Sequence, residues 1–335
     1  MIIPGIQTTV QDAGRFGYQW SGISPAGAMD LYSLRLANIL VGNEMDEAGL
    51  EITVVGPQLV FDCAEVIAIT GADLSPTLNG MPIAMNCAIS VRVGDVLCFG
   101  QKKDGARAYL AFAGGIDIPP LMNSRSTLLR NKLGSMNGNA LKKGDEVNLR
   151  SPCTDLPNQS YRFVEREPIE DQNVTLRVVM GPQDDYFTDE GIRTFLSTKG
   201  YRVTEQFSRH GYRLSGDVIQ HRKGGDIVSD GIALGAIQIP SDGQPIIMLA
   251  ERQSTGGYTK IANVISVDIA KISQCIAGAR ICFQPISIEQ AQKMLRDEYK
   301  SLCDLEEKMC FLTRCRMHHV RVNGIPYEIG IAAMQ

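Results

Sequence analysis

The first 150 residues alternate short apolar runs with turn residues. Apolar side chains recur at helical spacing from Leu31 to Leu40, behind a possible N-cap at Asp30 and ahead of Gly42-Asn43, which is typical of a helix end. β-branched or alternating segments then follow, separated by turn dipeptides. We expect strands at Leu50–Val55, Gln58–Phe61, Val66–Thr70, Ser90–Phe99, Tyr109–Ala113 and Glu146–Arg150. One helix among so many strands favours a closed barrel or a sandwich for residues 1–150.

Residues 173–285 repeat this β-rich pattern after a break. Residues 151–172 hold three prolines among polar and charged residues, which is typical of a linker. A helix is expected over Asp185–Ser197, with Thr188 as a possible cap. Strands are expected at Val174–Met180, Tyr212–Leu214, Ile237–Ile239, Ile246–Leu249, Ala262–Val267 and Ala279–Phe283. A Gly-Pro-Gln in each unit supports two tandem barrels of related shape, although two unrelated β-rich halves remain the alternative.

Residues 286–335 form an extension of different character. Ser287 and Gln290 have the spacing of a capping box, and apolar residues recur on one helical face to about Met309. This face must pack somewhere, and the second unit is the expected surface. The tail His319–Ile329 predicts a hairpin around Asn323-Gly324.

Composition narrows the classes of function. The 335 residues carry 33 basic and 37 acidic side chains, a balance that argues against nucleic-acid binding. The start lacks the basic and apolar regions of a signal peptide, and no apolar run reaches the roughly 18 residues of a membrane helix. Nine scattered cysteines without a CxxC pair favour reduced thiols in the cytoplasm. With four histidines, we expect no metal centre.

Standard catalytic motifs are missing, but a first polar stretch around glycines stands out. There is no GxxxxGK[ST], GxSxG or HExxH sequence. Gln11, Asp12 and Arg15 could place a carboxamide, a carboxylate and a guanidinium on one side of a turn, with Ser24 following in the next loop. An Asp–Arg pair that merely fixes a loop is the alternative.

A second stretch, Ser208 to Arg213, contains two arginines beside a glycine. Alternation along a strand would put Arg209 and Arg213 on the same face, where two guanidiniums suit a shared oxyanion or phosphate. The alternative is a solvated rim of charges.

The third stretch, residues 237–260, is the densest in polar groups. Adjacent glycines allow close backbone approach, and their N–H groups could line an anion-binding nest. A structural bulge between strands is the alternative. The candidate binding residues are Gln253, Thr255, Gly256, Gly257 and Tyr258, with Lys260 as a candidate catalytic cation.

Several motifs together resemble one family. Gln7–Arg15 reads Q-T-T-V-Q-D-A-G-R, and Leu50–Pro57, Ser124–Thr127, Gly235–Gln238 and Gln253–Ala262 also match. The chain resembles the KipA family, also described as allophanate hydrolase subunit 2, as the C-type subunit of 5-oxoprolinase or as the biotin-dependent carboxyltransferase family. The resemblance extends from about Met1 to Phe283.

This resemblance implies a mainly β fold of two tandem cyclophilin-like β-barrel domains with a few helices. It implies an ATP-dependent amide hydrolase that opens 5-oxo-L-proline to L-glutamate as part of a complex, with ATP and optionally Mg²⁺ bound by that complex. The implied partners are a KipI-type (B-type) subunit and an A-type subunit. On residue type and motif position, we expect Arg209, Arg213, Lys260 and Asp12 to be catalytic. Substrate or nucleotide would contact Gln11, Arg15, Ser24, Ser208, Gln253, Thr255, Gly256, Gly257 and Tyr258.

The chain departs from the family pattern in three places, one of them the segment Gly134–Asp145, and two other functions stay open. Relatives commonly read N-R-M-G-Y-R-L where this chain has Ser208-Arg209-His210, and its tail looks like the opening hairpin of a biotin-carrier domain. One alternative is the carboxyltransferase component of a biotin-dependent, urea carboxylase-like system. That function requires biotin on a separate carrier, because no carrier-lysine motif occurs in this chain. The other alternative is a non-catalytic antagonist of a KipI-type kinase inhibitor.

Overall fold

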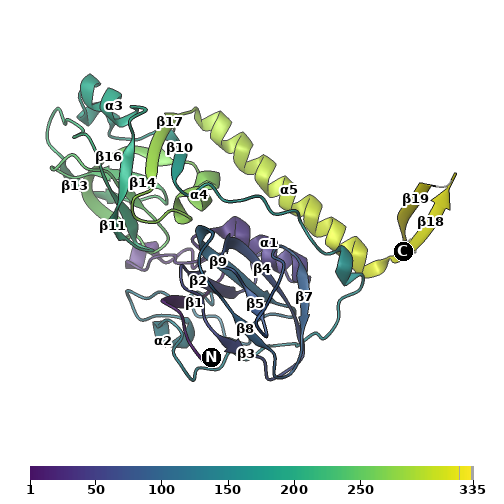
Figure 1. Ribbon diagram of the computed structural model, residues 1–335. Coiled ribbons are helices and arrows are strands. Elements are labelled where there is room, and N and C mark those ends of the chain that lie inside the picture. Colours follow the sequence, from purple (N-terminus) through teal and green to yellow (C-terminus); the bar gives the residue numbers. More distant parts are fainter. Residues whose placement is uncertain (324, 333–335) are drawn as a thin grey trace.

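Two β-rich halves lie side by side and a long helix crosses them both (Figure 1). The structure, a computed structural model, describes residues 1–323 and 325–332. We call residues 1–150 the first half and residues 173–285 the second half, with the linker between them.

The helices are short except for the first and the last of the α-helices. They are η1 (Gln19–Ser21), α1 (Leu31–Val41), α2 (Ser135–Gly138), η2 (Gln159–Tyr161), η3 (Asp184–Tyr186), α3 (Asp189–Phe195), η4 (Ser266–Asp268), α4 (Ile269–Ser273) and α5 (Ile288–Arg314), where η marks a 3-10 helix. The Asp30 side chain accepts a hydrogen bond from Ser33 N at the start of α1, and Gly42 ends the helix with a φ of 78°.

The first half contains two sheets that enclose one core. A five-stranded sheet has the order β1-β2-β9-β4-β7, and a four-stranded sheet has the order β3-β8-β5-β6. Val10, Ile52, Ile67, Leu97 and Leu110 come from both sheets and share a buried cluster. The strands are β1 (Gln7–Gln11), β2 (Gly49–Thr53), β3 (Leu59–Val60), β4 (Glu65–Asp73), β5 (Thr77–Leu78), β6 (Met81–Pro82), β7 (Ala88–Val91), β8 (Val96–Cys98) and β9 (Asp104–Phe112).

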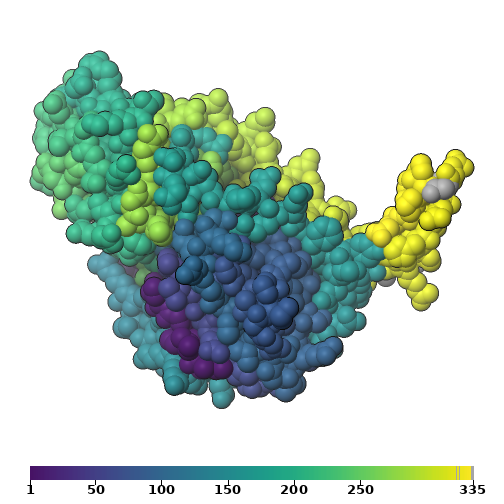
Figure 2. Space-filling model, viewed as in Figure 1, coloured from purple at the N-terminus to yellow at the C-terminus, as the bar shows by residue number. Residues whose placement is uncertain are grey.

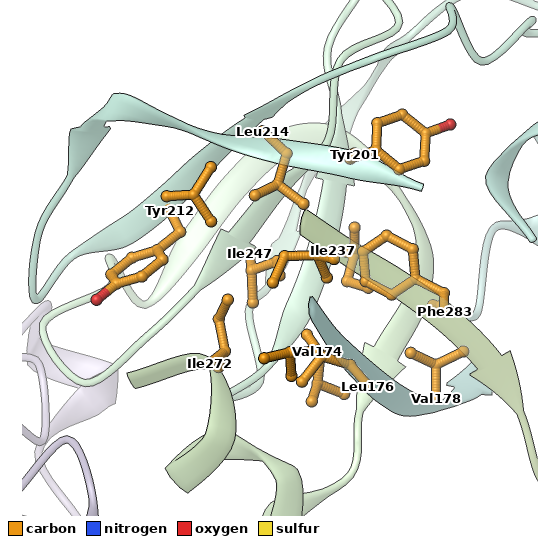
Figure 3. Close-up of a cluster of buried hydrophobic side chains, with 14 of the residues drawn as sticks. Val174, Leu176, Val178, Tyr201, Tyr212, Leu214, Ile237, Ile247, Ile272 and Phe283 are labelled. Atoms are coloured by element: carbon orange, nitrogen blue, oxygen red, sulfur yellow. The ribbon is translucent and has the colours of Figure 1, made fainter. Parts of the chain in front are cut away.

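The second half is a single sheet that closes on itself. Its order is β10-β17-β11-β12-β15-β14-β16-β13, and β10 also pairs with β16, so that the ring leaves out only β13. Leu176, Tyr212, Ile237, Ile247 and Phe283 fill its interior (Figure 3). The strands are β10 (Asn173–Met180), β11 (Tyr201–Phe207), β12 (Gly211–Ser215), β13 (Asp226–Gly231), β14 (Ala236–Ile239), β15 (Ile246–Met248), β16 (Thr255–Val264) and β17 (Arg280–Pro285).

The C-terminal helix α5 returns to the first half. Ser287 and Gln290 form the expected capping box. Leu302, Met309 and Leu312 are buried in a cluster with Leu36 and Leu40 of α1, so the expectation that α5 packs on the second unit is wrong over this stretch. Beyond α5, the hairpin β18 (Arg316–Val322) and β19 (Ile325–Ile331) stands away from the body (Figure 2).

The mainly β class with a C-terminal helix and hairpin is confirmed, with local corrections. Residues 146–150 form no strand and contribute one isolated bridge, between Ile116 and Leu149. The expected strand Ser90–Phe99 is divided between β7 and β8 by a turn. The expected helix Asp185–Ser197 is η3 followed by α3, which Thr188 caps. Gly324 of the predicted hairpin turn lies outside the described residues, and the cyclophilin-like type of each half stays a prediction.

Two kinds of structure are not found among the described residues. None of their helices is both long enough and apolar enough to cross a membrane. Within the same residues, no group of three or more His, Cys, Asp and Glu side chains is placed to hold a metal ion.

Candidate functional site

Four side chains form a row across the outer face of the second half. Arg213 on β12 is paired with Ile246 on β15, Ile246 with Gln238 on β14, and Gln238 with Lys260 on β16. Directly paired residues lie on the same face of a sheet. Since Ile237, next to Gln238, belongs to the interior core, this row faces outward. Two predicted cations, Arg213 and Lys260, therefore lie at opposite ends of one row.

A cavity of about 390 Å³ opens over part of this row. Arg213 is 38% exposed at one side, and its Nη1 lies 3.2 Å from the Asp242 carboxylate at the surface. Because such an exposed ion pair is worth little, Arg213 can exchange Asp242 for a ligand anion. We call this cavity the outer groove; it is lined by Gln206, Phe207, Ser208, His210, Gly211, Arg213, Gln238, Ile246, Met248, Gln253 and Tyr258.

Two carboxamides in the outer groove have buried atoms without hydrogen bonds. Within the described part of the chain, neither Nε2 of Gln238 nor Oε1 of Gln253 has a hydrogen-bond partner. A side chain at Gly256 would place its Cβ 2.8 Å from Gln238 Nε2 and 3.4 Å from Gln253 Nε2. The glycine therefore keeps room beside both amides. Because an unpaired buried amide is unfavourable, this pair suits a ligand that offers one acceptor and one donor.

Lys260 lies beside the groove and is almost fully buried. Its Nζ is 3.3 Å from Asp230 Oδ2 but donates no hydrogen bond of ordinary geometry among the described residues. The pKa of Asp230 is lowered, first by the N–H of Gly231 and then by Lys260. Lys260 is thus a cation only partly neutralised by an exposed carboxylate.

His210 connects the groove to the first half. Its Nδ1 lies 3.0 Å from the carbonyl oxygen of Glu251 and 3.4 Å from Nη1 of Arg130. A carbonyl oxygen only accepts hydrogen bonds, so the shorter contact assigns the proton to Nδ1. In this tautomer Nε2 has a lone pair, and His210 is a candidate base. The sequence analysis did not select His210, Arg130 or Gln238; alternation along β14 could have indicated Gln238.

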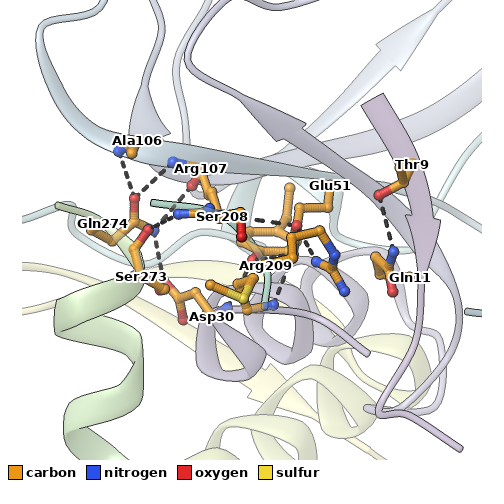
Figure 4. Close-up of polar contacts among 12 residues, drawn as sticks. Thr9, Gln11, Asp30, Glu51, Ala106, Arg107, Ser208, Arg209, Ser273 and Gln274 are labelled. Atoms are coloured by element: carbon orange, nitrogen blue, oxygen red, sulfur yellow. Dashed lines mark hydrogen bonds and ion pairs between the residues drawn. The ribbon is translucent and has the colours of Figure 1, made fainter. Parts of the chain in front are cut away.

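Arg209 lies in a different environment from Arg213. It is 3% exposed and binds Glu51 of the first half (Figure 4). Its Nε also lies 2.8 Å from Glu251 Oε1 of the second half. Its Nη2 donates to the carbonyl oxygen of Gly27 at 2.6 Å. Burial alone would lower the pKa of Arg209, but the two glutamates outweigh it and raise the pKa. The expectation that Arg209 and Arg213 share a face is wrong, because β12 begins only at Gly211.

The Arg209 contacts belong to a larger cluster between the halves. Glu51 Oε2 accepts hydrogen bonds from Met29 N and from the Tyr109 hydroxyl, each at 2.8 Å. Arg107 donates to the Tyr212 hydroxyl at 2.7 Å. Gln274 of the second half accepts from Arg107 N and donates to Asp30, at 2.8 and 2.7 Å (Figure 4). We call these groups the junction cluster, and they fix the two halves together.

The first predicted stretch is used to hold loops of the first half. Asp12 accepts hydrogen bonds from Gly14 N, Ser124 Oγ, Ser126 Oγ and Arg125 N, which occupies both carboxylate oxygens. Arg15 is buried, donates to carbonyl oxygens in the 121–126 loop, and has its pKa lowered mainly by burial. These contacts favour the alternative that Asp12 and Arg15 fix a loop. They do not do so as an Asp–Arg pair, however, because each binds the 121–126 loop separately.

The two other first-half candidates are also engaged internally. Nε2 of Gln11 donates to Thr9 and to the carbonyl oxygen of Thr127, each at 3.0 Å, while its buried Oε1 has no hydrogen-bond partner among the described residues. Ser24 donates to the Arg252 carbonyl oxygen at 2.5 Å and so joins the halves. Gln11 and Ser24 do not line the outer groove. The cations Arg15, Arg209 and Lys260 do not line it either, so they do not meet there.

The glycine pair is part of a strand. Thr255, Gly256 and Gly257 open β16, where Gly256 pairs with Asp230 and Tyr258 pairs with Asp226 of β13. Neither glycine has the positive φ that an anion-binding nest requires. The nest expected here is therefore absent from this described segment, while the glycines still provide the room beside Gln238.

Comparisons with known proteins place the chain in one family. The family model "Carboxyltransferase domain, subdomain A and B" matches residues 21–285. The C subunit of the 5-oxoprolinase of Escherichia coli strain K12 is 34% identical over 307 residues, which cover 90% of this chain and 95% of that protein. Urea amidolyase of Lachancea kluyveri is 36% identical over 326 residues, which cover 91% of this chain and 18% of that protein. The structure of the K. lactis urea amidolyase has a TM-score of 0.84 at 34% identity, covering 91% of this chain and 20% of that one. The chain thus spans nearly all of the 5-oxoprolinase relative and about a fifth of the amidolyases.

Proposed function

The chain belongs to the family of carboxyltransferase domains with subdomains A and B, and on that basis we propose that it is the C-type subunit of a 5-oxoprolinase. The complex would open 5-oxo-L-proline to L-glutamate with ATP, in the cytoplasm, together with KipI-type and A-type partner subunits. The observation that carries the proposal is the match over 95% of the E. coli C subunit.

Three side chains of the outer groove are chemically complementary to 5-oxoproline, which is why the groove supports the proposal. 5-oxoproline carries a carboxylate, a lactam carbonyl oxygen and a lactam N–H. The Arg213 guanidinium suits the carboxylate. Gln238 Nε2 would donate to the carbonyl oxygen and Gln253 Oε1 would accept from the N–H, so the two unpaired amide atoms would both gain partners.

The same residues suggest how the chain assists the chemistry. A lactam carbonyl is a poor electrophile, and transfer of the γ-phosphoryl group to its oxygen, with release of ADP, would activate it. Water would then attack the carbon, and the C–N bond would break to free the amine and leave an acyl phosphate. A second water would hydrolyse this acyl phosphate to the glutamate carboxylate and inorganic phosphate. His210 is the proposed base for the water, and Lys260 would stabilise charge on the oxygen. We assign no Mg²⁺ ligand to this chain, and ATP binding by the complex remains a proposal.

Reconstitution tests the function. The full chain is co-expressed with its KipI-type and A-type partner subunits, and glutamate release from 5-oxoproline is followed with and without ATP. We expect ATP-dependent turnover only when all three are present. Turnover that is unchanged when this chain is left out would refute the proposal.

A second candidate is the carboxyl-transfer component of a biotin-dependent system that acts on urea. The TM-score of 0.84 to the K. lactis urea amidolyase favours it. Urea also offers a carbonyl oxygen and N–H groups to Gln238 and Gln253, but it has no carboxylate for Arg213. Biotin on a separate carrier would be needed for this reaction.

Arg213→Gln distinguishes the two functions. We expect it to raise KM for 5-oxoproline about tenfold or more, because a charge-assisted pair is lost, and to leave any urea-dependent discharge of carboxylated biotin unchanged. Arg193→Gln is the matched control, since Arg193 is 71% exposed on α3 and does not line the groove. A KM unaffected by Arg213→Gln in an active complex would remove Arg213 from the site.

A further inference from the structure

A second cavity lies where both halves meet α5. It has a volume of about 170 Å³ and does not share any residue with the outer groove. Its walls are mostly apolar and include Pro25, Met29, Leu234, Val267, Ile269 and Leu295. We call it the Arg252 cavity, after the more deeply buried of the two arginines that line it; the other, Arg35, is paired with Asp46.

Arg252 is a buried cation whose charge no carboxylate balances. It is 6% exposed, and its pKa is shifted by burial alone, with no contribution from a carboxylate among the described residues. Nε donates to the carbonyl oxygen of Ile232 at 3.0 Å, and Nη1 donates to that of Leu249 at 3.3 Å. These two bonds leave further N–H groups of the fork available. Burial lowers the pKa of Arg252 to about 10.

A second buried arginine shows what is missing at Arg252. Arg209 is equally buried, but two glutamates surround it. Removing a guanidinium from water is unfavourable unless an anion or equivalent hydrogen bonds replace the water. Arg252 therefore lines this largely apolar cavity with a charge that no carboxylate neutralises, and a ligand anion there would neutralise it. Arg252 also lines a neighbouring cavity of about 390 Å³, with Ile232 and Ser254.

The shape and walls of the cavity limit what that anion can be. A cavity of roughly 150 Å³ lined by apolar side chains accommodates benzene, so about 170 Å³ suits a single ring. An inorganic anion would leave the apolar walls uncovered. Glu298 also lines the cavity, and its carboxylate would repel a second negative charge on the ligand.

We propose that the Arg252 cavity binds a small monocarboxylate with a compact apolar body, the carboxylate paired with Arg252 and the apolar part against the walls. Such a ligand would contact the first half, the second half and α5 together. 5-oxoproline fits this cavity poorly, because its lactam would bury two polar groups among apolar side chains.

Calorimetry on the full-length chain tests the proposal, with benzoate as the probe. Benzamide keeps the ring without the charge, and acetate keeps the charge without the ring. We expect benzoate to bind at one site per chain and to raise Tm, with benzamide and acetate at least about tenfold weaker. Equal binding of benzamide, or no benzoate binding at millimolar concentration, would overturn the proposal.

Two variants locate the site. Arg252→Met keeps the length and apolar character of the side chain and should weaken benzoate binding about tenfold or more, whereas the exposed control Arg193→Met should not. Ala28 also lines the cavity, so Ala28→Leu should fill it while Arg252 remains, and should abolish binding even if Arg252→Met does not fold. Benzoate affinity that is unchanged in Ala28→Leu would refute the site.

Discussion

The junction cluster and the outer groove treat buried polar side chains in opposite ways. At the junction, Arg209 and Glu51 each have several partners from both halves. In the groove, Gln238 and Gln253 hold buried amide atoms that no described residue contacts through a hydrogen bond. Among the described groups of the junction cluster, only the buried Nε of Arg107 lacks a hydrogen-bond partner, and it lies 3.8 Å from Glu51 Oε1. A largely satisfied buried network stabilises one arrangement of the chain, while unsatisfied groups beside a cavity are available to a ligand. A buried polar residue therefore indicates a binding site only if its hydrogen-bonding atoms lack partners within the protein.

The pKa values of two buried or half-buried glutamates are shifted in opposite directions. Burial tends to raise the pKa of Glu51, but Arg209 and Arg107 outweigh it, and the pKa is lowered. Glu298, beside the Arg252 cavity, has its pKa raised to about 7 by burial and by the nearby Asp30, which Arg35 only partly offsets. Burial tends to raise the pKa of both glutamates, and the charged partners decide whether the pKa ends above or below its usual value.

The largest effect is expected from breaking the junction cluster. Arg209→Met would leave Glu251 and part of Glu51 buried without their cation. We expect the free energy of unfolding to fall by about 3–5 kcal/mol, measured by urea denaturation. A loss below about 1 kcal/mol would show that the cluster does not hold the halves together.

An intermediate effect, on activity alone, is expected in the groove. Gln238→Leu removes an unpaired amide, so stability should stay within about 1 kcal/mol of the parent. In the reconstituted complex, kcat/KM for 5-oxoproline should fall roughly tenfold to a hundredfold through loss of the bond to the lactam oxygen. Gln220→Leu, at an exposed position outside the groove lining, is the control. A marked loss of stability with full activity would show that Gln238 supports the fold and does not bind substrate.

The smallest effect concerns Glu298 and its dependence on pH. Because its folded-state pKa is raised, the folded protein holds the proton more tightly, and ionisation between pH 4.5 and about 7 reduces stability. Glu298→Gln should remove this slope. Relative to the parent, the variant should therefore gain stability as pH rises through that window, by roughly 1 kcal/mol or less after allowance for solvent exposure. Parallel stability curves from pH 4 to 8 would contradict the assignment.

Much of the fold could be predicted because its signals are local. The caps at Asp30, Thr188 and Ser287 act within three residues, and each is found where the sequence indicated. β13, in contrast, was missed because it is a polar edge strand whose side chains are mostly exposed, so that no alternation of apolar residues marks it.

The candidate site could be predicted only in part. Ser208, Arg213, Gln253 and Tyr258 were selected from sequence and do line the outer groove. Asp12 and Arg15 are also polar residues of a conspicuous sequence motif, but they bind atoms of the 121–126 loop, more than a hundred residues away. Residue type does not reveal whether a distant loop already occupies a polar group.

The amino-acid order alone determined the mainly β class, the helix boundaries marked by caps, and the family, since each depends on neighbours along the chain. The tertiary structure decided that Arg213, Gln238 and Lys260 form one row, that Arg209 faces Glu51, and that α5 packs on α1. The physical reason is that strand register and the packing of the halves are set by contacts among residues far apart in sequence. A change of one residue in register would turn Arg213, Gln238 or Lys260 to the opposite face of its sheet.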